Sequence, residues 1–253
     1  LVKYIFLLFA VCIGLLSNDI AAQQTKASGN SDNLNLAPTR KYKKARALQS
    51  STAKKMAKVY EALEEVDEKG EPAPDMETVV SILTELKNNR DELKSYDRSV
   101  MWNAWAYVYF SDGDYSKALS AYTSLINEPD VTIGLRVGAL LSMGQIYLVQ
   151  ERYTQGIAYI LQWMKEVETV TAQSWALLGQ AYFATEDYRK SLSSVEKAIL
   201  LAEEEGYKPR ENWYVIMAAN INELKSEIGE KESLLKQIDL SLIHISEPTR
   251  LAE

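Results

Sequence analysis

Three stretches of the chain share one pattern: WNAWAYVYFSDGDYSKALSAY at 102–122, LLSMGQIYLVQERYTQGIAYI at 140–160 and WALLGQAYFATEDYRKSLSSV at 175–195. They align on Tyr115, Tyr153 and Tyr188, which are separated by 38 and 35 residues. Self-similarity at a period of about 20 to 50 residues indicates a repeat protein, in which each unit packs on its neighbours. The apolar residues inside each stretch recur at steps of three and four, which predicts pairs of helices.

Each stretch carries a large residue, an apolar residue, a small residue and a tyrosine in its first half and another small residue in its second half. In chain order these positions are Trp102, Trp105, Ala106, Tyr109 and Ala118; Leu140, Met143, Gly144, Tyr147 and Gly156; and Trp175, Leu178, Gly179, Tyr182 and Ser191. The pattern resembles tetratricopeptide (TPR) repeats. The resemblance implies an all-α, right-handed superhelical solenoid of antiparallel helix pairs with about four repeats, the last truncated. The small residues would let paired helices approach closely, and the tyrosines would fill the space between them.

The repeats are expected at 99–132, 137–170, 172–205 and 210–239, the last being partial and opening at Trp213. Residues 45–98 would form a divergent first hairpin with a long turn that contains proline. Its first helix follows apolar residues from Ala47 to Val66, and Asp75 is the expected N-cap of its second helix.

The composition agrees with a helical protein and leaves little for catalysis. The 253 residues are 47% hydrophobic and 25% charged, with only 11 glycines and 6 prolines, fewer turn residues than an all-β fold needs. The single cysteine, Cys12, and the single histidine, His244, exclude a disulfide framework within the chain and a Cys/His zinc cluster. No nucleotide-binding, serine-hydrolase or zinc-protease motif is present. We therefore expect no enzyme activity, no catalytic residue, no metal and no cofactor, and we interpret residues 111–114 (SDGD) as a turn rather than a calcium loop.

Both ends of the chain differ from the repeats. Residues 1–22 have the three-part order of a secretory signal peptide, Lys3, an apolar run and then small residues, and the run is shorter than the roughly 20 residues that span a bilayer. Residues 23–44 form a polar, then basic leader that we expect to be flexible. Residues 240–253 (LSLIHISEPTRLAE) resemble the conceptual translation of a transposon-end sequencing adapter. We therefore expect export to the periplasm and an artefactual C-terminal tail.

The repeat alignment predicts a partner-binding groove. In proteins with such repeats, the inner face of each first helix lines a concave surface. Carried over residue by residue, this face comprises Asn103, Tyr107, Phe110, Leu141, Gln145, Leu148, Gln180, Phe183 and Tyr214. The groove would be apolar with amides, which suits an extended or helical peptide. The alternative is that some of these residues only pack against neighbours.

A basic segment precedes the repeats although the net charge of the chain is −7. Between residues 40 and 58 there are eight cations and no acid: Arg40, Lys41, Lys43, Lys44, Arg46, Lys54, Lys55 and Lys58. The segment could hold the protein peripherally against anionic lipid. The alternatives are a solvated helix face and neutralisation of the acidic array beside it. We expect no nucleic-acid partner, because the chain is acidic and carries an export signal.

A finer resemblance comes from EDYRKSLSSVEKAI at 186–199 and PRENWYVIMAANINELK at 209–225. Across 45–235 the chain is similar to secreted TPR proteins associated with TonB/ExbB/ExbD systems of Gram-negative proteobacteria. The resemblance implies a periplasmic, non-catalytic scaffold that binds an envelope protein of such an energy-transduction complex. The alternative is an interaction or regulatory module of a peptidoglycan or polysaccharide enzyme whose catalytic part lies beyond residue 239.

Overall fold

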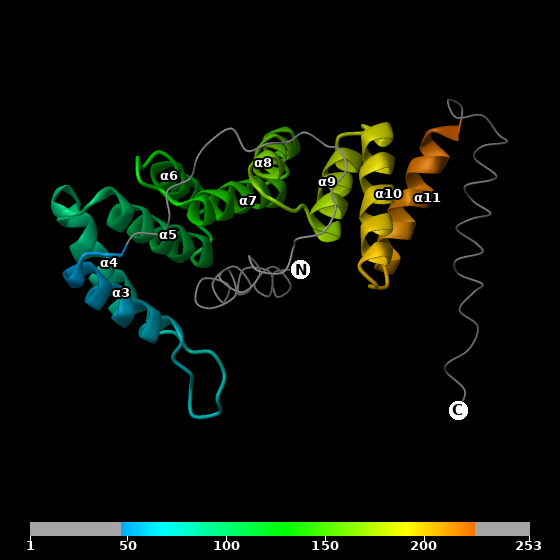
Figure 1. Cartoon of the computed structure of the whole chain (residues 1–253). Helices are drawn as coiled ribbons and strands as arrows, with labels where there is room; N and C mark the ends of the chain where they lie inside the picture. Colours follow the sequence, from blue (N-terminus) through cyan, green and yellow to red (C-terminus); the bar gives the residue numbers. More distant parts are fainter. Residues whose placement is uncertain (1–46, 226–253) are drawn as a thin grey trace. The chain divides into compact units, whose positions relative to one another are not determined.

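The structure, a computed structural model, describes residues 47–225. The expected signal peptide, the leader, the part of the basic segment at 40–46, the end of the fourth repeat and the adapter-like tail lie outside these residues. The described helices, coloured along the chain in Figure 1, are α3 Ser50–Leu63, α4 Met76–Asn88, the short 3-10 helix η1 Arg90–Glu92, α5 Ser95–Ser111, α6 Tyr115–Ile126, α7 Ile133–Val149, α8 Tyr153–Glu166, α9 Ala172–Ala184, α10 Tyr188–Glu204 and α11 Glu211–Glu223.

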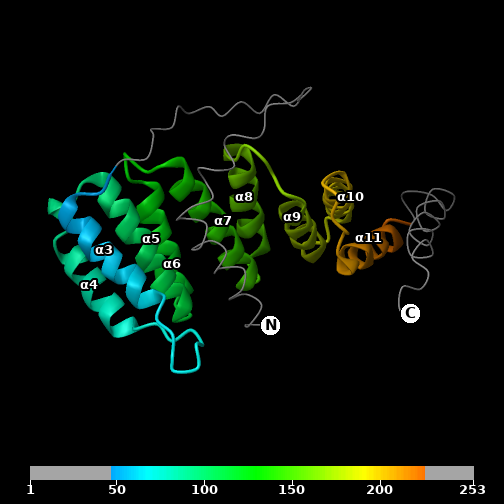
Figure 2. The same ribbon diagram turned by 60° about the horizontal axis from the view of Figure 1, so that its bottom comes forward.

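The helices pack as successive pairs. Within pairs, α3 contacts α4, α5 contacts α6, α7 contacts α8 and α9 contacts α10; between pairs, α4 contacts α5, α6 contacts α7, α8 contacts α9 and α10 contacts α11. Figure 2 shows the pairs following one another in chain order. The predicted all-α solenoid of helix pairs is therefore confirmed for the described part of the chain.

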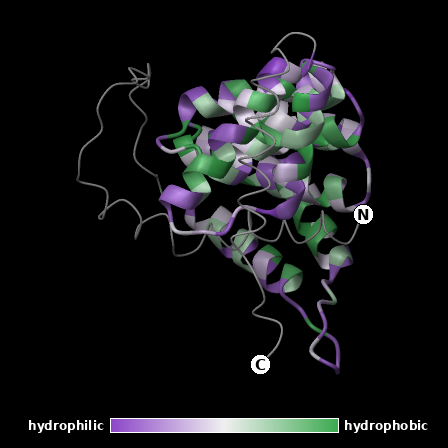
Figure 3. Cartoon of the chain, turned by 90° about the vertical axis from the view of Figure 1, so that its right-hand side faces the viewer, coloured by the Kyte–Doolittle hydropathy of each residue, from purple (hydrophilic) through white to green (hydrophobic). Residues whose placement is uncertain are grey.

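The first hairpin differs in detail from the sequence pattern. Helix α3 ends at Leu63, and Val66 lies beyond it in a single bridge to Pro72, with 59% of its surface exposed. The loop that follows is mostly hydrophilic (Figure 3). The carboxylate of Asp75 accepts a hydrogen bond from the amide of Thr78 at 3.0 Å, so its predicted role as the N-cap of α4 is confirmed.

The turns inside the three aligned pairs share one backbone conformation. Gly113 has a φ of +78°, and Glu151 and Glu186, at the corresponding positions, have φ values of 59° and 61°. Ser111 ends α5, and residues 112 and 113 form a turn. Asp114 then caps α6, since its carboxylate accepts a hydrogen bond from the amide of Lys117 at 3.0 Å. The predicted turn is thus confirmed at this position.

Small residues set the distance between paired helices. A Cβ built on Gly144 would lie 2.8 Å from Cγ1 of Ile160, and one on Gly179 would lie 2.5 Å from Cγ2 of Val195. Real Cβ atoms essentially never come this close to another heavy atom. Ala106, the counterpart in α5, has no exposed surface. The predicted close approach of the helices at these positions is confirmed.

Candidate functional site

The predicted groove residues divide into those that face outward and those that hold a helix pair together. Tyr107, Gln145 and Gln180 each lie eight residues before the aligned tyrosine, on α5, α7 and α9. Tyr107 and Gln145 are half-buried and Gln180 is exposed. None of these three side chains has a hydrogen-bond partner within residues 47–225, and the same holds for Asn103, one turn earlier on α5. The four side chains, which we call the polar row, keep their hydrogen-bonding capacity for another molecule.

The apolar members of the predicted groove pack mainly inside their own helix pairs. The rings of Phe110 and Tyr115 have centroids 5.6 Å apart, and those of Phe183 and Tyr188 are also 5.6 Å apart. Leu148, at the same position of the second pair, fills the space above Gly156, where a Cβ would lie 2.5 Å from its Cδ2. These residues fasten the end of each first helix to the second helix.

The remaining two groove residues also contribute to packing. Leu141 is half-buried against the core cluster that includes Leu140 and Leu178. Tyr214 is only 8% exposed, lies in the core cluster of α9 to α11, and places its hydroxyl 3.5 Å from Oε1 of Glu203. The predicted groove therefore leaves mainly the polar row available to a partner, since most of its apolar residues pack within the repeats. Its role as a binding groove stays a prediction.

The described part of the basic segment lies on α3. Lys54 and Lys58 are exposed, whereas Nζ of Lys55 lies 2.8 Å from Oε1 of Glu85 on α4. One of these three cations is thus neutralised within the hairpin. Peripheral membrane contact through residues 40–58 stays a prediction, because the other five cations lie outside the described residues.

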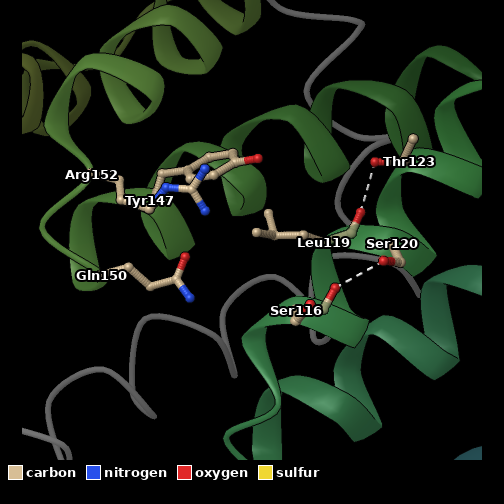
Figure 4. A pocket seen from close by; sticks show the side chains of 7 residues that line it. All are labelled: Ser116, Leu119, Ser120, Thr123, Tyr147, Gln150 and Arg152. Atoms are coloured by element: carbon tan, nitrogen blue, oxygen red, sulfur yellow. Dashed lines mark hydrogen bonds between the residues drawn. The ribbon is translucent and has the colours of Figure 1, made fainter.

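A pocket that the sequence did not predict lies between α6 and the turn that joins α7 to α8. Its volume is about 430 Å³, and its lining consists of Ser116, Leu119, Ser120, Thr123, Tyr147, Gln150 and Arg152. Figure 4 shows Tyr147, Gln150 and Arg152 on one side of it and the four α6 residues on the other. No residue of the predicted groove lines this pocket.

Hydroxyl oxygens on α6 lie across the pocket from a guanidinium donor. On α6, the hydroxyl of Ser120 donates to the carbonyl of Ser116 at 2.9 Å, and that of Thr123 donates to the carbonyl of Leu119 at 2.8 Å. Each hydroxyl hydrogen is therefore already used, and the oxygen lone pairs remain as acceptors. The opposite wall carries the guanidinium group of Arg152, a donor with no acceptor capacity.

The guanidinium group of Arg152 is supported by an aromatic stack. It lies 4.6 Å from the ring centroid of Tyr147, whose ring stacks with that of Tyr159 at a centroid distance of 5.3 Å. Burial raises the pKa of Tyr159, with a further contribution from Tyr147. Within the described residues the guanidinium of Arg152 has no hydrogen-bond or ion-pair partner, and the buried Oε1 of Gln150 beside it has none either. The pocket thus contains a cation with free donors.

A second feature missing from the sequence interpretation is a pair of arginine clamps. Arg98 makes two hydrogen bonds to Glu128, both at 2.8 Å, and Arg136 makes two to Glu166, at 2.7 and 3.0 Å. The hydrogen bonds to Glu128 are the main cause of the raised pKa of Arg98. Both arginines also donate to main-chain carbonyls that precede their own pairs. The two arginines are 38 residues apart, as are the two glutamates, so the repeat period was a signal that could have revealed them.

Two searches for other kinds of site among the described residues are negative. No three His, Cys, Asp or Glu side chains between residues 47 and 225 are grouped closely enough to hold a metal ion. No helix in the same part of the chain combines the length and apolar character that crossing a membrane requires.

Comparisons with known proteins identify the fold. No protein-family model matches the sequence, and no curated protein matches it. Two solved structures, a MamA RS-1 ArsTM double mutant and MamA 41-end from Desulfovibrio magneticus RS-1, each align with a TM-score of 0.53; they are 15% and 14% identical and cover 79% and 80% of this chain and 100% of their own. The C-terminal part of a TPR repeat-containing protein from Cytophaga hutchinsonii aligns with a TM-score of 0.46 at 18% identity, over 65% of this chain and 59% of its own. At these identities the likeness to the two MamA structures shows a shared helical-repeat fold.

Proposed function

We propose that this chain is a non-catalytic scaffold of the periplasm that binds a protein of an envelope complex, specifically of a TonB-dependent energy-transduction system. The partner would lie along the first helices of the repeats. The repeat fold supports the scaffold role, since stacked helix pairs commonly present extended binding surfaces. The signal-like order of residues 1–22 and the resemblance at 186–199 and 209–225 motivate the location and the partner class.

The observation that carries this proposal is the polar row. Tyr107, Gln145 and Gln180 occupy the same position on three successive first helices, and their polar groups have no partner within residues 47–225. Their side-chain donors and acceptors are therefore available to a bound chain. Amide side chains can donate to and accept from a peptide backbone, and the half-buried Leu141, Leu148 and Phe183 leave part of their apolar surface for its side chains.

Site-specific crosslinking tests the proposal. A photo-crosslinking amino acid at position 107 or 180 of the full chain, produced in a Gram-negative cell, should give one discrete adduct with an envelope protein. Mass spectrometry of that adduct identifies the partner. Adducts with a TonB-system component support the complete proposal, and a different envelope partner overturns the TonB link while retaining the scaffold role.

A substitution series separates the polar row from general surface effects. Tyr107→Ala combined with Gln180→Ala should reduce recovery of the crosslinked partner, measured with the probe at position 145, at least about tenfold, because both flanking contacts are lost. The matched control, Leu200→Ala with Val215→Ala, removes side chains that are 54% and 63% exposed outside the row, and should leave recovery unchanged. Equal recovery from both variants would rule out this surface as the binding site.

The location has its own test. Removal of residues 1–22 should leave the protein in the cytoplasmic fraction, whereas the full chain should appear in the periplasmic fraction. Recovery of both forms from the cytoplasm would contradict periplasmic export.

A further inference from the structure

We propose that the pocket between α6 and the α7–α8 turn is a second binding site, which holds a carboxylate of an acidic polypeptide segment on the guanidinium of Arg152. The pocket shares no residue with the polar row. The inference rests on the proposed function only in that the carboxylate belongs to a protein partner.

Comparison of the three aligned pairs shows that Arg152 departs from a local rule. In the first and third pairs the corresponding residue is aspartate, and it pairs with a lysine three residues later: Asp114 with Lys117 at 2.6 Å and Asp187 with Lys190 at 2.5 Å. Each lysine also lies over the repeat tyrosine, at 5.6 Å from the ring of Tyr109 and 5.3 Å from that of Tyr182. In both pairs the cation on the tyrosine is neutralised by the protein itself.

The second pair keeps the cation and loses its counter-charge. Arg152 replaces the aspartate and Gln155 replaces the lysine, so the group over Tyr147 is now the arginine, without an acidic partner among the described residues. The exchange also removes the N-cap of α8, because Arg152 makes no capping hydrogen bond. A missing cap destabilises a helix, and a cation at a helix N-terminus is electrostatically unfavourable. Departures from local rules of this kind tend to occur where a binding role compensates for them.

The geometry leaves the donors of Arg152 free to bind an anion. A guanidinium that stacks on an aromatic ring uses its flat face and keeps the N–H groups in its plane available. None of the seven lining residues is acidic, so a ligand carboxylate would meet no like charge in the pocket wall. Paired N–H donors match the two oxygens of a carboxylate, which gives short charge-assisted hydrogen bonds.

The α6 wall indicates that the carboxylate belongs to a peptide. Ser120 and Thr123 offer acceptor oxygens there, which suit the N–H groups of a peptide backbone rather than a second anionic group. The space itself results from short side chains. At the position of Thr123, the next second helix carries Leu161, which packs against the core cluster of α7 and α8.

NMR titration of the full chain with short peptides tests the site. Two probes are capped pentapeptides, one with a central glutamate and one with glutamine in its place. The third is an alanine peptide with a blocked N-terminus, whose only carboxylate is its C-terminus. The fourth is inorganic phosphate at equal ionic strength. We expect the Arg152 side-chain N–H and the Tyr147 ring signals to shift with the glutamate peptide and not with its glutamine twin. The C-terminal probe distinguishes a chain end from an acidic side chain as the source of the carboxylate, and binding of that probe alone would overturn the assignment to an acidic segment.

The decisive variant restores the local rule of the other pairs. Arg152→Asp with Gln155→Lys should regain the cap and the internal ion pair, so the protein should be at least as stable as the parent, while its affinity for the carboxylate peptide falls at least about tenfold. Thr123→Leu, which fills the pocket without changing charge, should have the same effect on binding. Lys58→Gln removes an exposed cation from α3 and should leave binding unchanged.

Three results would overturn the site: equal binding of the glutamate and glutamine peptides, undiminished binding by the Arg152→Asp/Gln155→Lys variant, or phosphate binding as tight as that of the carboxylate peptides. Tyr107→Ala with Gln180→Ala should not alter the peptide titration. The carboxylate site and the proposed scaffold function can therefore fail independently.

Discussion

At the scale of single residues, glycine is required at some helix positions and only tolerated at others. Gly179 faces Val195 and the carbonyl of Ser191, whose hydroxyl in turn donates to the carbonyl of Gly179 at 2.8 Å. Gly138, also inside a first helix, has nothing within 4 Å of an added Cβ. The repeat alignment marks Gly179 and not Gly138, and the second helix of each pair supplies the packing reason for that difference.

This difference predicts opposite effects of the same substitution. Gly179→Ala should lower the free energy of unfolding by about 1 to 3 kcal/mol, because Val195 has to move to accept the methyl group. Gly138→Ala should raise it by up to about 1 kcal/mol through helix propensity alone. Urea denaturation followed by circular dichroism measures both values, and equal effects would contradict the packing of α9 on α10.

At the scale of elements, the aspartates that cap three helices make the stability of those helices depend on pH. The pKa values of Asp114 and Asp187 are lowered from 3.8, mainly by hydrogen bonds to Lys117 and Lys190, and that of Asp75 is lowered by Thr78. A carboxyl with a lower pKa in the folded state contributes stability above its unfolded pKa, and this contribution is lost as the pH falls through the folded pKa. Helices α4, α6 and α10 should therefore weaken in acid.

The cap prediction concerns the response to acid. In the Asp114→Asn/Asp187→Asn variant, asparagine can still cap but cannot titrate, so Tm should fall less than in the parent as the pH drops from about 5 to about 2. Thermal scans at a series of pH values measure this difference. Parallel curves for the two proteins would show that these caps do not contribute to acid sensitivity.

The arginine clamps also act at the element scale, by joining the two ends of a helix pair. The side chains of Arg136 and Glu166 are only 14% and 17% exposed, and Arg136 also donates to the carbonyl of Ile126 at 3.2 Å. Arg136→Gln should cost about 2 kcal/mol of unfolding free energy, since charge-assisted bonds are lost and a sheltered carboxylate remains. Lys55→Gln, in a pair that is 33% and 55% exposed, should cost less than about 1 kcal/mol. Similar losses in denaturant titrations would contradict this order.

At the scale of the whole molecule, the clamp is missing from one pair. Where the first two pairs have arginine and glutamate, the third has Thr171 and Leu201. Helix α9 still packs on α8, because Leu178 lies in one core cluster with Trp163 and Met164. Within the third pair, α9 packs on α10 through apolar residues such as Ala176 and Val195, without the arginine–glutamate bonds that join the ends of the first two pairs.

Because the stability of a repeat protein is close to a sum over units and interfaces, this difference should appear as stepwise opening. Native-state hydrogen exchange should show α9 to α11 opening at a lower free energy than α5 to α8. Arg136→Gln should reduce the protection of α7 and α8 and leave that of α10 unchanged. A single opening energy for all of these helices would refute the prediction.

Most of the architecture was predictable because its determinants are local. The 38- and 35-residue spacings, the small residues at 144 and 179 and the cap at Asp75 act within one or two helices, so periodicity and capping rules identify them. The candidate sites were less predictable. The alignment correctly placed the polar row on the first helices, but it could not show that Phe110 and Phe183 pack on Tyr115 and Tyr188.

The sequence by itself therefore determined the repeat class, the helix pairs and their turns, since each depends on residues that are neighbours along the chain. The tertiary structure decided which side chains remain free. The packing of helices that are distant in the sequence decides whether Gln145 and Gln180 find hydrogen-bond partners. It also brings Arg98 to Glu128 and places Arg152 across a pocket from α6. Local rules do not specify that packing, because it results from the combined shapes of side chains on several helices.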